Sequence, residues 1–187
     1  MTSNIIEKYH VEYGFSLIPN KPRSKIPAVK EYKQYFDKVC YEEIKPNQNV
    51  GVMTGRPSNN LVVFDDDTFA ETFFEIFSQY RNTTFSTKSG KKGGGIFFRL
   101  SELPKFTYAT IAKDGKQIEF FAGKRQIILP PSIHPDTGNK YEIKNDSQVL
   151  NITGDEFESI FKKFKELGWE ISYNTDKNTA FLGTQNK

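Results

Sequence analysis

The stretch "NLVVFDDDTF", residues 60–69, joins an apolar run directly to three consecutive carboxylates. The run "LVVF" is continuous rather than alternating, which is typical of a strand buried on both faces of a sheet. Because side chains alternate along a strand, Asp65 and Asp67 are expected on one face and Asp66 on the other. Two carboxylates on one face repel each other unless a cation lies between them. The stretch therefore predicts a central strand that ends in a candidate cation site.

Two interpretations of these carboxylates are open from the sequence. Hard divalent ions such as Mg²⁺ take oxygen ligands, often one or two carboxylates together with substrate phosphates. In phosphoryl transfer, paired metals about 3.5–4 Å apart contact the attacking and the leaving oxygens. The alternative is structural: Asp66 or Asp67 caps a helix that begins near Phe69. The two interpretations are compatible, because a carboxylate at a helix start can also line a site.

A third acidic residue, Glu119, lies in the segment "KQIEFFAG". In a strand it faces opposite to its neighbours Ile118 and Phe120. It is either a third ligand for a cation or a solvent-facing strand residue, since alternation places polar residues on the outer faces of strands throughout proteins.

Hydrophobic periodicity predicts a mixed α/β fold. We expect helices over 4–14, near 29–36, over 68–80 and over 155–167, the last with a capping box of Thr153 and Glu156. We expect strands within 15–19, 48–55, 60–64, 83–100, 125–132, 139–144 and 169–173, and a hairpin over 106–123 that turns at Asp114-Gly115. Helices and strands alternate early and antiparallel strands dominate later. This order predicts one domain of two packed lobes over residues 1–175, followed by a flexible tail over 176–187.

Composition narrows the setting of the protein. The chain has 187 residues, of which 36% are hydrophobic, and no apolar run is long enough to cross a membrane. The N-terminus lacks the apolar core of a signal peptide. Cys40 is the lone cysteine, which excludes an internal disulfide and a cysteine-based zinc site. We therefore expect a cytoplasmic protein, and the net charge of +3 gives a weak indication of an anionic partner.

Basic residues gather in three short segments. The loop within "STKSGKKGGGIFFR", residues 86–99, has no Walker A pattern but places lysines beside a run of glycines. Glycines let backbone N–H groups approach phosphate oxygens, although a flexible hairpin tip with solvated lysines explains the pattern equally well. The other two clusters are candidates for nucleic-acid phosphates or are ordinary solvated surface. These two clusters are Lys21, Arg23 and Lys25, and Lys124 and Arg125.

Taken together, the segments resemble the archaeo-eukaryotic primase superfamily, specifically the primase–polymerase (prim-pol) domains of plasmid, phage and mobile-element replication proteins. The resemblance runs from about Tyr13 to about Tyr141. It is carried by the order of the pieces "YGFSLIPNKPRSKIPAVKEYKQY", "NVGVMTG", "LVVFDDD" and "QIEFFAGKRQIILPPSIHPDTGNKYEI". The third piece looks like the strand with the family's first acidic motif, and the last piece looks like the segment with its third acid.

The resemblance implies a fold, an activity and a set of site residues. It implies an N-terminal α/β unit packed with an RRM-like antiparallel sheet, with the active site in the cleft between them. It implies a DNA primase/polymerase that uses Mg²⁺ or Mn²⁺, a single-stranded DNA template, and NTPs or dNTPs. A helicase on another chain, or in a region absent from this one, would unwind the duplex. The metal ligands carried over from the family are Asp65, Asp67 and Glu119, and the remaining candidates are Ser89, Gly90, Lys91 and Lys92 for the nucleotide and Lys21, Arg23 and Lys25 for nucleic acid.

One family feature is missing, and it leaves two further alternatives. The family's second motif has a histidine that contacts the phosphates of the nucleotide, and here Gly95 stands in its place. Either Lys91 or Lys92 takes over that contact, or the chain is a weakened or inactive relative that binds DNA as a replication-initiation module.

A rolling-circle replication endonuclease is a further alternative. Such an enzyme needs a close pair of histidines, whereas His10 and His134 are far apart in sequence. His134 itself is expected to be a turn residue that is hydrogen-bonded locally.

Overall fold

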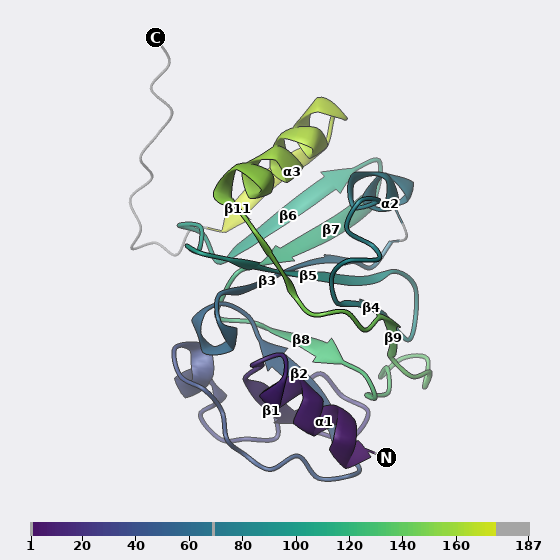
Figure 1. Ribbon diagram of the computed structural model, residues 1–187. Helices are drawn as coiled ribbons and strands as arrows, with labels where there is room; N and C mark the ends of the chain where they lie inside the picture. Colours follow the sequence, from purple (N-terminus) through teal and green to yellow (C-terminus); the bar gives the residue numbers. More distant parts are fainter. Residues whose placement is uncertain (1, 69, 175–187) are drawn as a thin grey trace.

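The computed structural model describes residues 2–68 and 70–174, which form two β-sheets with helices packed around them (Figure 1). In Figure 1 the larger sheet crosses the middle of the molecule, α2 and α3 lie above it, and the smaller sheet lies below it with α1. The fold is thus a mixed α/β fold, as the sequence predicts. The expected tail over 176–187 lies outside the described residues.

The elements follow one another along the chain in this order: α1 (Thr2–Val11), β1 (Leu17–Asn20), the 3₁₀ helix η1 (Tyr32–Phe36), β2 (Asn49–Met53), the 3₁₀ helix η2 (Arg56–Ser58), β3 (Leu61–Asp66), α2 (Glu71–Ile76), β4 (Ser86–Lys88), β5 (Gly94–Leu100), β6 (Tyr108–Lys113), β7 (Lys116–Phe121), β8 (Gln126–Leu129), β9 (Glu142–Asn145), β10 (Leu150–Ile152), α3 (Gly154–Glu166) and β11 (Glu170–Asn174). The smaller sheet has the order β1-β2-β8. The larger sheet has the order β11-β6-β7-β3-β5-β4-β9, and β10 pairs with β5.

The predicted central strand, β3, lies in the middle of the larger sheet. It pairs antiparallel with β5 on one side and with β7 on the other. Val62 and Phe64 pack on one face in a core shared with α2 and α3, while Leu61 and Val63 pack on the opposite face in a core shared with α1 and the smaller sheet. Burial on both faces explains why the run "LVVF" does not alternate.

The hairpin and the last helix form where the sequence predicts them. β6 and β7 are joined at Asp114 and Gly115, which adopt φ angles of 51° and 74°, as a two-residue hairpin turn requires. The side chain of Thr153 accepts a hydrogen bond from the backbone N–H of Glu156, and the side chain of Glu156 bonds back to the N-cap backbone. This capping box begins α3, whose buried face carries Phe157, Ile160, Phe161 and Phe164.

One prediction about secondary structure needs correction, and one strand was missed. The helix expected over 68–80 is only six residues long, because α2 ends at Ile76 and the chain continues in turns. Phe77 and Tyr80 nevertheless pack in the core, so buried apolar residues at helical spacing extend beyond the end of α2. The short strand β10 was not predicted; its three residues pair parallel with β5, a contact that local sequence does not reveal. None of the helices within the described residues is long and apolar enough to cross a membrane.

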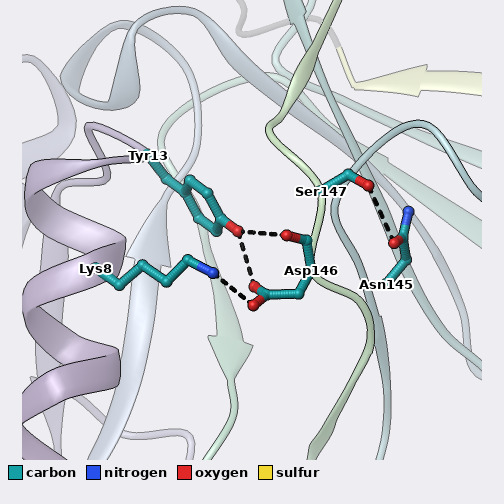
Figure 2. Close-up of polar contacts among 5 residues, drawn as sticks. All are labelled: Lys8, Tyr13, Asn145, Asp146 and Ser147. Atoms are coloured by element: carbon teal, nitrogen blue, oxygen red, sulfur yellow. Dashed lines mark hydrogen bonds and ion pairs between the residues drawn. The ribbon is translucent and has the colours of Figure 1, made fainter.

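A polar cluster ties α1 to the segment between β9 and β10 (Figure 2). The ammonium of Lys8 lies 2.5 Å from a carboxylate oxygen of Asp146, and the hydroxyl of Tyr13 donates to the other oxygen at 2.8 Å. The same hydroxyl also lies 3.0 Å from the backbone carbonyl of Asp146. Burial acts to raise the pKa of Asp146, but the hydrogen bonds from Lys8 and Tyr13 and the charge of Lys8 outweigh it and lower that pKa.

We expect Asp146→Asn to lower the free energy of unfolding at pH 7 by about 1 kcal/mol, a modest value because the carboxyl is half exposed. Since the folded pKa is lowered, this stability is present above the unfolded value of 3.8 and is lost as the pH falls through the folded pKa. Urea unfolding at pH 7 and near pH 3 measures the difference. Glu158→Gln, an exposed carboxyl on α3, is the control; an equal loss in both variants at pH 7 would contradict the role of Asp146.

Candidate active site

A cleft of about 220 Å³ lies between the two sheets. Strands β3 and β7 form one wall, the strand β8 forms the opposite wall, and the loop after β1 lies at its rim. The lining consists of Lys25, Asp65, Asp67, Thr87, Ser89, Gly94, Glu119, Phe121, Arg125, Gln126, Ile127, Ile128 and Tyr141. Residues far apart in sequence therefore meet in one hollow, which contains all three of the predicted acids.

Strand pairing places Asp65 and Glu119 next to each other. The antiparallel register of β3 and β7 sets Asp65 directly opposite Glu119. Cross-strand partners share a face and have Cβ atoms roughly 5 Å apart, so both carboxyl groups point to the same side of the sheet. Asp67 follows two residues after Asp65 and also lines the cleft.

The middle acid, Asp66, has a structural role on the other face. Its buried carboxylate accepts hydrogen bonds from the backbone N–H groups of Thr68 and Ala70, at 2.9 and 2.7 Å, and from the Thr68 hydroxyl at 3.0 Å. The N-cap of α2 is Ala70 and has no side-chain cap, so the expectation that Asp66 or Asp67 caps this helix is wrong; Asp66 instead holds the backbone that leads into the helix. Asp65 and Asp67, by contrast, both line the cleft.

The acidic side chains in the cleft repel one another electrostatically. Burial, together with the negative charges of Asp67 and Glu119, raises the pKa of Asp65 to about 7. The positive charge of Lys25 acts in the opposite direction. Asp65 is thus hard to ionise in the protein alone, and a cation in the cleft would favour its charged form.

Glu119 is held from the side by an aromatic residue of the neighbouring strand. The hydroxyl of Tyr108 on β6 donates a hydrogen bond to Glu119 Oε1, and the hydroxyl of Thr110 lies 3.2 Å from that of Tyr108. The guanidinium of Arg125 lies over the Tyr108 ring, 4.2 Å from its centroid. This arrangement fixes the orientation of Glu119 and brings Arg125 to the cleft.

The donor set suits a hard divalent cation, although the side chains are not in coordinating positions. Among residues 2–68 and 70–174, no three acidic, histidine or cysteine side chains stand in the arrangement of a metal site. Asp65 on β3, Glu119 on β7 and Asp67 just after β3 share the cleft, offer carboxylate oxygens and repel one another. Carboxylate oxygens are the ligands that Mg²⁺ prefers.

We expect Tyr108→Phe to raise the Mn²⁺ concentration needed for half-maximal binding by about tenfold, because Glu119 loses the hydrogen bond that orients it. Calorimetric titration of Mn²⁺ measures the change. Tyr32→Phe removes a hydroxyl from η1, outside the lining of the cleft, and is the control. Identical Mn²⁺ affinity of the Tyr108 variant and the wild type would show that Glu119 needs no such support.

Two cationic side chains line the acidic cleft. Lys25 comes from the basic loop after β1, and Arg125 comes from the turn that enters β8. Gln126 holds the loop in place, because its side-chain amide donates to Asn20 Oδ1 at 2.9 Å and to the backbone carbonyl of Lys25 at 2.8 Å. The side-chain amide of Asn20 bonds back to Gln126 at 3.1 Å. Lys25 and Arg125 thus supply positive charge beside the acids.

The other candidates from the basic segments are dispersed. Ser89 lines the cleft, where its hydroxyl donates to the carbonyl of Lys92 at 2.6 Å and so shapes the glycine loop. The carbonyl of Gly90 accepts a bond from the Thr137 hydroxyl at 2.8 Å, which ties this loop to the turn after β8. Lys91 and Lys92 line a different pocket, on the other side of β5. Lys21 and Arg23 are exposed and are not part of the cleft lining.

The structure also shows the surroundings of Gly95, which stands in place of the family's histidine, and of His134. Gly95 lies opposite Asp65 in the register of β3 and β5, so a side chain there would point to the face of the sheet that carries the acids. A Cβ on Gly95 would lie 3.1 Å from the Phe97 ring and 3.3 Å from Val63, so space is tight. His134 is buried, its Nδ1 accepts from the backbone N–H of Asp136 at 3.2 Å, and its ring stacks on Tyr141. His134 is therefore a turn residue, as expected.

Sequence reasoning missed Tyr108, Gln126 and Tyr141. A signal for Tyr108 was present, because the two-residue turn at Asp114-Gly115 fixes the register and sets Thr110 opposite Glu119. Tyr108 is then the diagonal neighbour of Glu119 on the same face, within reach of its carboxyl. Tyr141 lies in the last piece that carries the family resemblance, but its sequence did not indicate that it lines the cleft. Gln126 had no comparable signal.

Comparison with known families supports a functional reading of this cleft. The family model described as "Bifunctional DNA primase/polymerase, N-terminal" (Prim-Pol) matches residues 7–156. The match extends from α1 into the first turn of α3 and includes every residue that lines the cleft. A search of curated proteins found no significant match.

Proposed function

The chain belongs to the Prim-Pol family, and from this premise we propose that it catalyses template-directed nucleotidyl transfer, both starting and extending primers on single-stranded DNA. The observation that supports the proposal most is the meeting of Asp65, Asp67 and Glu119 in one cleft between the sheets. Replication of a plasmid or another mobile element, with a helicase on a separate chain or region, is the setting that we propose for this activity.

In this proposal Asp65, Asp67 and Glu119 hold two Mg²⁺ or Mn²⁺ ions. When bound, such ions lower the pKa of the attacking 3′-hydroxyl and stabilise negative charge on the α-phosphate and the leaving pyrophosphate. Lys25 and Arg125 bind the triphosphate beside the acids, because they bring the positive charges of the cleft lining.

The remaining lining orients the substrate. Phe121, Ile127 and Ile128 give the cleft an apolar wall on which a sugar or base packs. Ser89 and Gly94 also line the cleft and present hydroxyl and backbone groups to it. This assignment replaces Lys91 and Lys92 as the proposed nucleotide contacts, since neither is part of the cleft lining.

De novo synthesis on a single-stranded template, with labelled NTPs or dNTPs and with Mg²⁺ or Mn²⁺, tests the proposal. We expect labelled products with the wild type and none with Asp67→Asn or Glu119→Gln. Undiminished synthesis by either variant would remove the assigned site.

A second candidate is a non-catalytic Prim-Pol domain that binds DNA in replication initiation. Gly95 favours it, because the position opposite Asp65 carries no side chain to contact phosphates. Against it stands the raised pKa of Asp65, since three acids kept together without a cation are an unrelieved cost. Calorimetry separates the two candidates: Mn²⁺ increases the affinity for a nucleoside triphosphate if the domain is catalytic and has no effect if it is not.

A further inference from the structure

A second pocket, of about 470 Å³, lies on the opposite side of β5 from the acids. Its lining includes two buried core residues, Phe73 of α2 and Phe77 just after it, together with the glycine loop and β4. We call it the basic pocket because five of its lining residues are cationic: Arg81, Lys88, Lys91, Lys92 and Lys144.

The positive charge of the basic pocket is largely uncompensated. Its lining has a single carboxylate, Asp66, whose oxygens already accept bonds from Thr68 and Ala70. Lys88 lies 3.6 Å from Glu142 in an exposed ion pair. Within the described part of the chain, Arg81, Lys91, Lys92 and Lys144 form no ion pair. A concentration of like charges of this kind attracts an anionic ligand.

The cations are spread over separate elements rather than gathered at one point. Arg81 follows α2, Lys88 ends β4, Lys91 and Lys92 lie in the β4–β5 loop, and Lys144 lies on β9. A single triphosphate is compact, whereas the phosphates of a nucleic-acid strand are spaced along its length. Point charges distributed over four elements fit the second pattern.

An aromatic ring completes the features of the basic pocket. Phe74 is half-buried in its lining, and the guanidinium of Arg81 lies 5.6 Å from the centroid of the Phe74 ring. Cationic grooves with aromatic side chains are the usual means of binding single strands, since every base has a face that can stack.

The basic pocket also borders the acidic cleft. Thr87 and Gly94 line both, so the backbone of β4 and β5 is all that separates the two hollows at this point. Gly94 is required there, because a Cβ on it would lie 2.0 Å from the carbonyl oxygen of Thr87. A strand bound in the basic pocket would thus pass beside the end of the acidic cleft.

We infer that the basic pocket binds the phosphate backbone of single-stranded DNA and guides this strand past the edge of β4 and β5. The inference builds on the proposed function, because it supplies a path for the template. Binding of the strand does not depend on catalysis or on metal ions, however, so it is measured separately.

The test compares two double variants that lose the same charge. Lys91→Gln with Lys144→Gln removes two cations of the basic pocket, and Lys163→Gln with Lys165→Gln removes two exposed cations of α3. A fluorescein-labelled oligothymidylate of about 16 nucleotides is the probe, and its anisotropy is followed in EDTA over a range of salt concentrations. A nucleoside triphosphate is titrated in parallel.

We expect the basic-pocket variant to bind the oligonucleotide about tenfold more weakly and to lower the slope of log K against log salt by about 1.4, which corresponds to two phosphate contacts. The α3 variant should match the wild type within about twofold, apart from general charge effects. Equal affinities of the two double variants would overturn the inference, and so would a loss of triphosphate binding with unchanged oligonucleotide binding. Neither result bears on whether Asp67→Asn abolishes synthesis, so the two proposals fail independently.

Discussion

Asp65→Asn is expected to reduce nucleotide incorporation by about a thousandfold or more, equivalent to roughly 4 kcal/mol of transition-state stabilisation. Asp65 is the acid with two acidic neighbours in the cleft, and an amide in its place supplies a weaker, uncharged ligand. The same change should make the metal-free protein more stable at pH 8. Loss of activity with a gain in stability identifies a functional charge, whereas a residue needed for folding loses both.

The sign of the stability effect follows from the raised pKa of Asp65. Its unfolded value of 3.8 rises to about 7 in the folded protein, so the folded state prefers the protonated carboxyl. Its contribution to stability is present in full below the unfolded pKa and is lost as the pH rises through about 7. Asparagine avoids this loss, which predicts a gain of about 1–2 kcal/mol at pH 8 in EDTA and no gain near pH 4.

Primer extension and thermal unfolding at the two pH values measure both parts of this prediction. Asp114→Asn, in the exposed hairpin turn, is the control, since asparagine also accepts its positive φ angle of 51°. The control should keep full activity and show no gain in stability at pH 8. A lower melting temperature for Asp65→Asn in EDTA at pH 8 would contradict the repulsion that we assign to the cleft.

Gly93→Ala is expected to destabilise the protein by about 3–5 kcal/mol, the largest stability effect that we predict. Gly93 has a φ angle of +70°, and a Cβ there would lie 1.5 Å from the backbone carbonyl oxygen of Asp66. The clash is with backbone rather than with a flexible side chain, so the glycine loop or the end of β3 must move. Since Asp65 and Asp67 flank Asp66, such a movement also displaces the acids of the cleft.

Gly115→Ala separates the clash from backbone strain. Gly115 has a φ angle of +74°, close to that of Gly93, but a Cβ there would meet nothing within 4 Å. Its substitution should cost about 1 kcal/mol, from the left-handed conformation alone. Urea unfolding of the two variants gives the comparison, and equal destabilisation would mean that contact with Asp66 is unimportant.

The sequence predicted the parts of the site that depend on strand geometry. The alternation of side chains at the end of β3 correctly assigned Asp65 and Asp67 to one face and Asp66 to the other. The apolar run before them was sufficient to predict a central strand, because a strand that is buried on both faces needs apolar side chains on both. The turn at Asp114-Gly115 set the register of β6 against β7, which places Thr110 opposite Glu119. It did not specify the pairing of β7 with β3, which places Glu119 opposite Asp65.

The sequence was less informative where position depends on contacts between the sheets. Lys91 and Lys92 stand close to Ser89 in sequence, yet the chain turns at the glycines and places the lysines on the other side of β5. Lys25 and Arg125 are separated by many residues and come together because β1 and β8 flank β2 in the smaller sheet. The clusters of basic residues in the sequence therefore predicted basic surface, but they did not predict where in the fold that surface lies.

The proposed function requires that the cleft hold cations between Asp65, Asp67 and Glu119. Electron paramagnetic resonance of Mn²⁺ at pH 8, with a nucleoside triphosphate and without DNA, measures the bound ions directly. We expect wild-type protein to bind Mn²⁺ and the double variant Asp65→Asn with Glu119→Gln, still folded by circular dichroism, to lose this binding. Equal amounts of bound Mn²⁺ in the wild type and the double variant would contradict the proposed function.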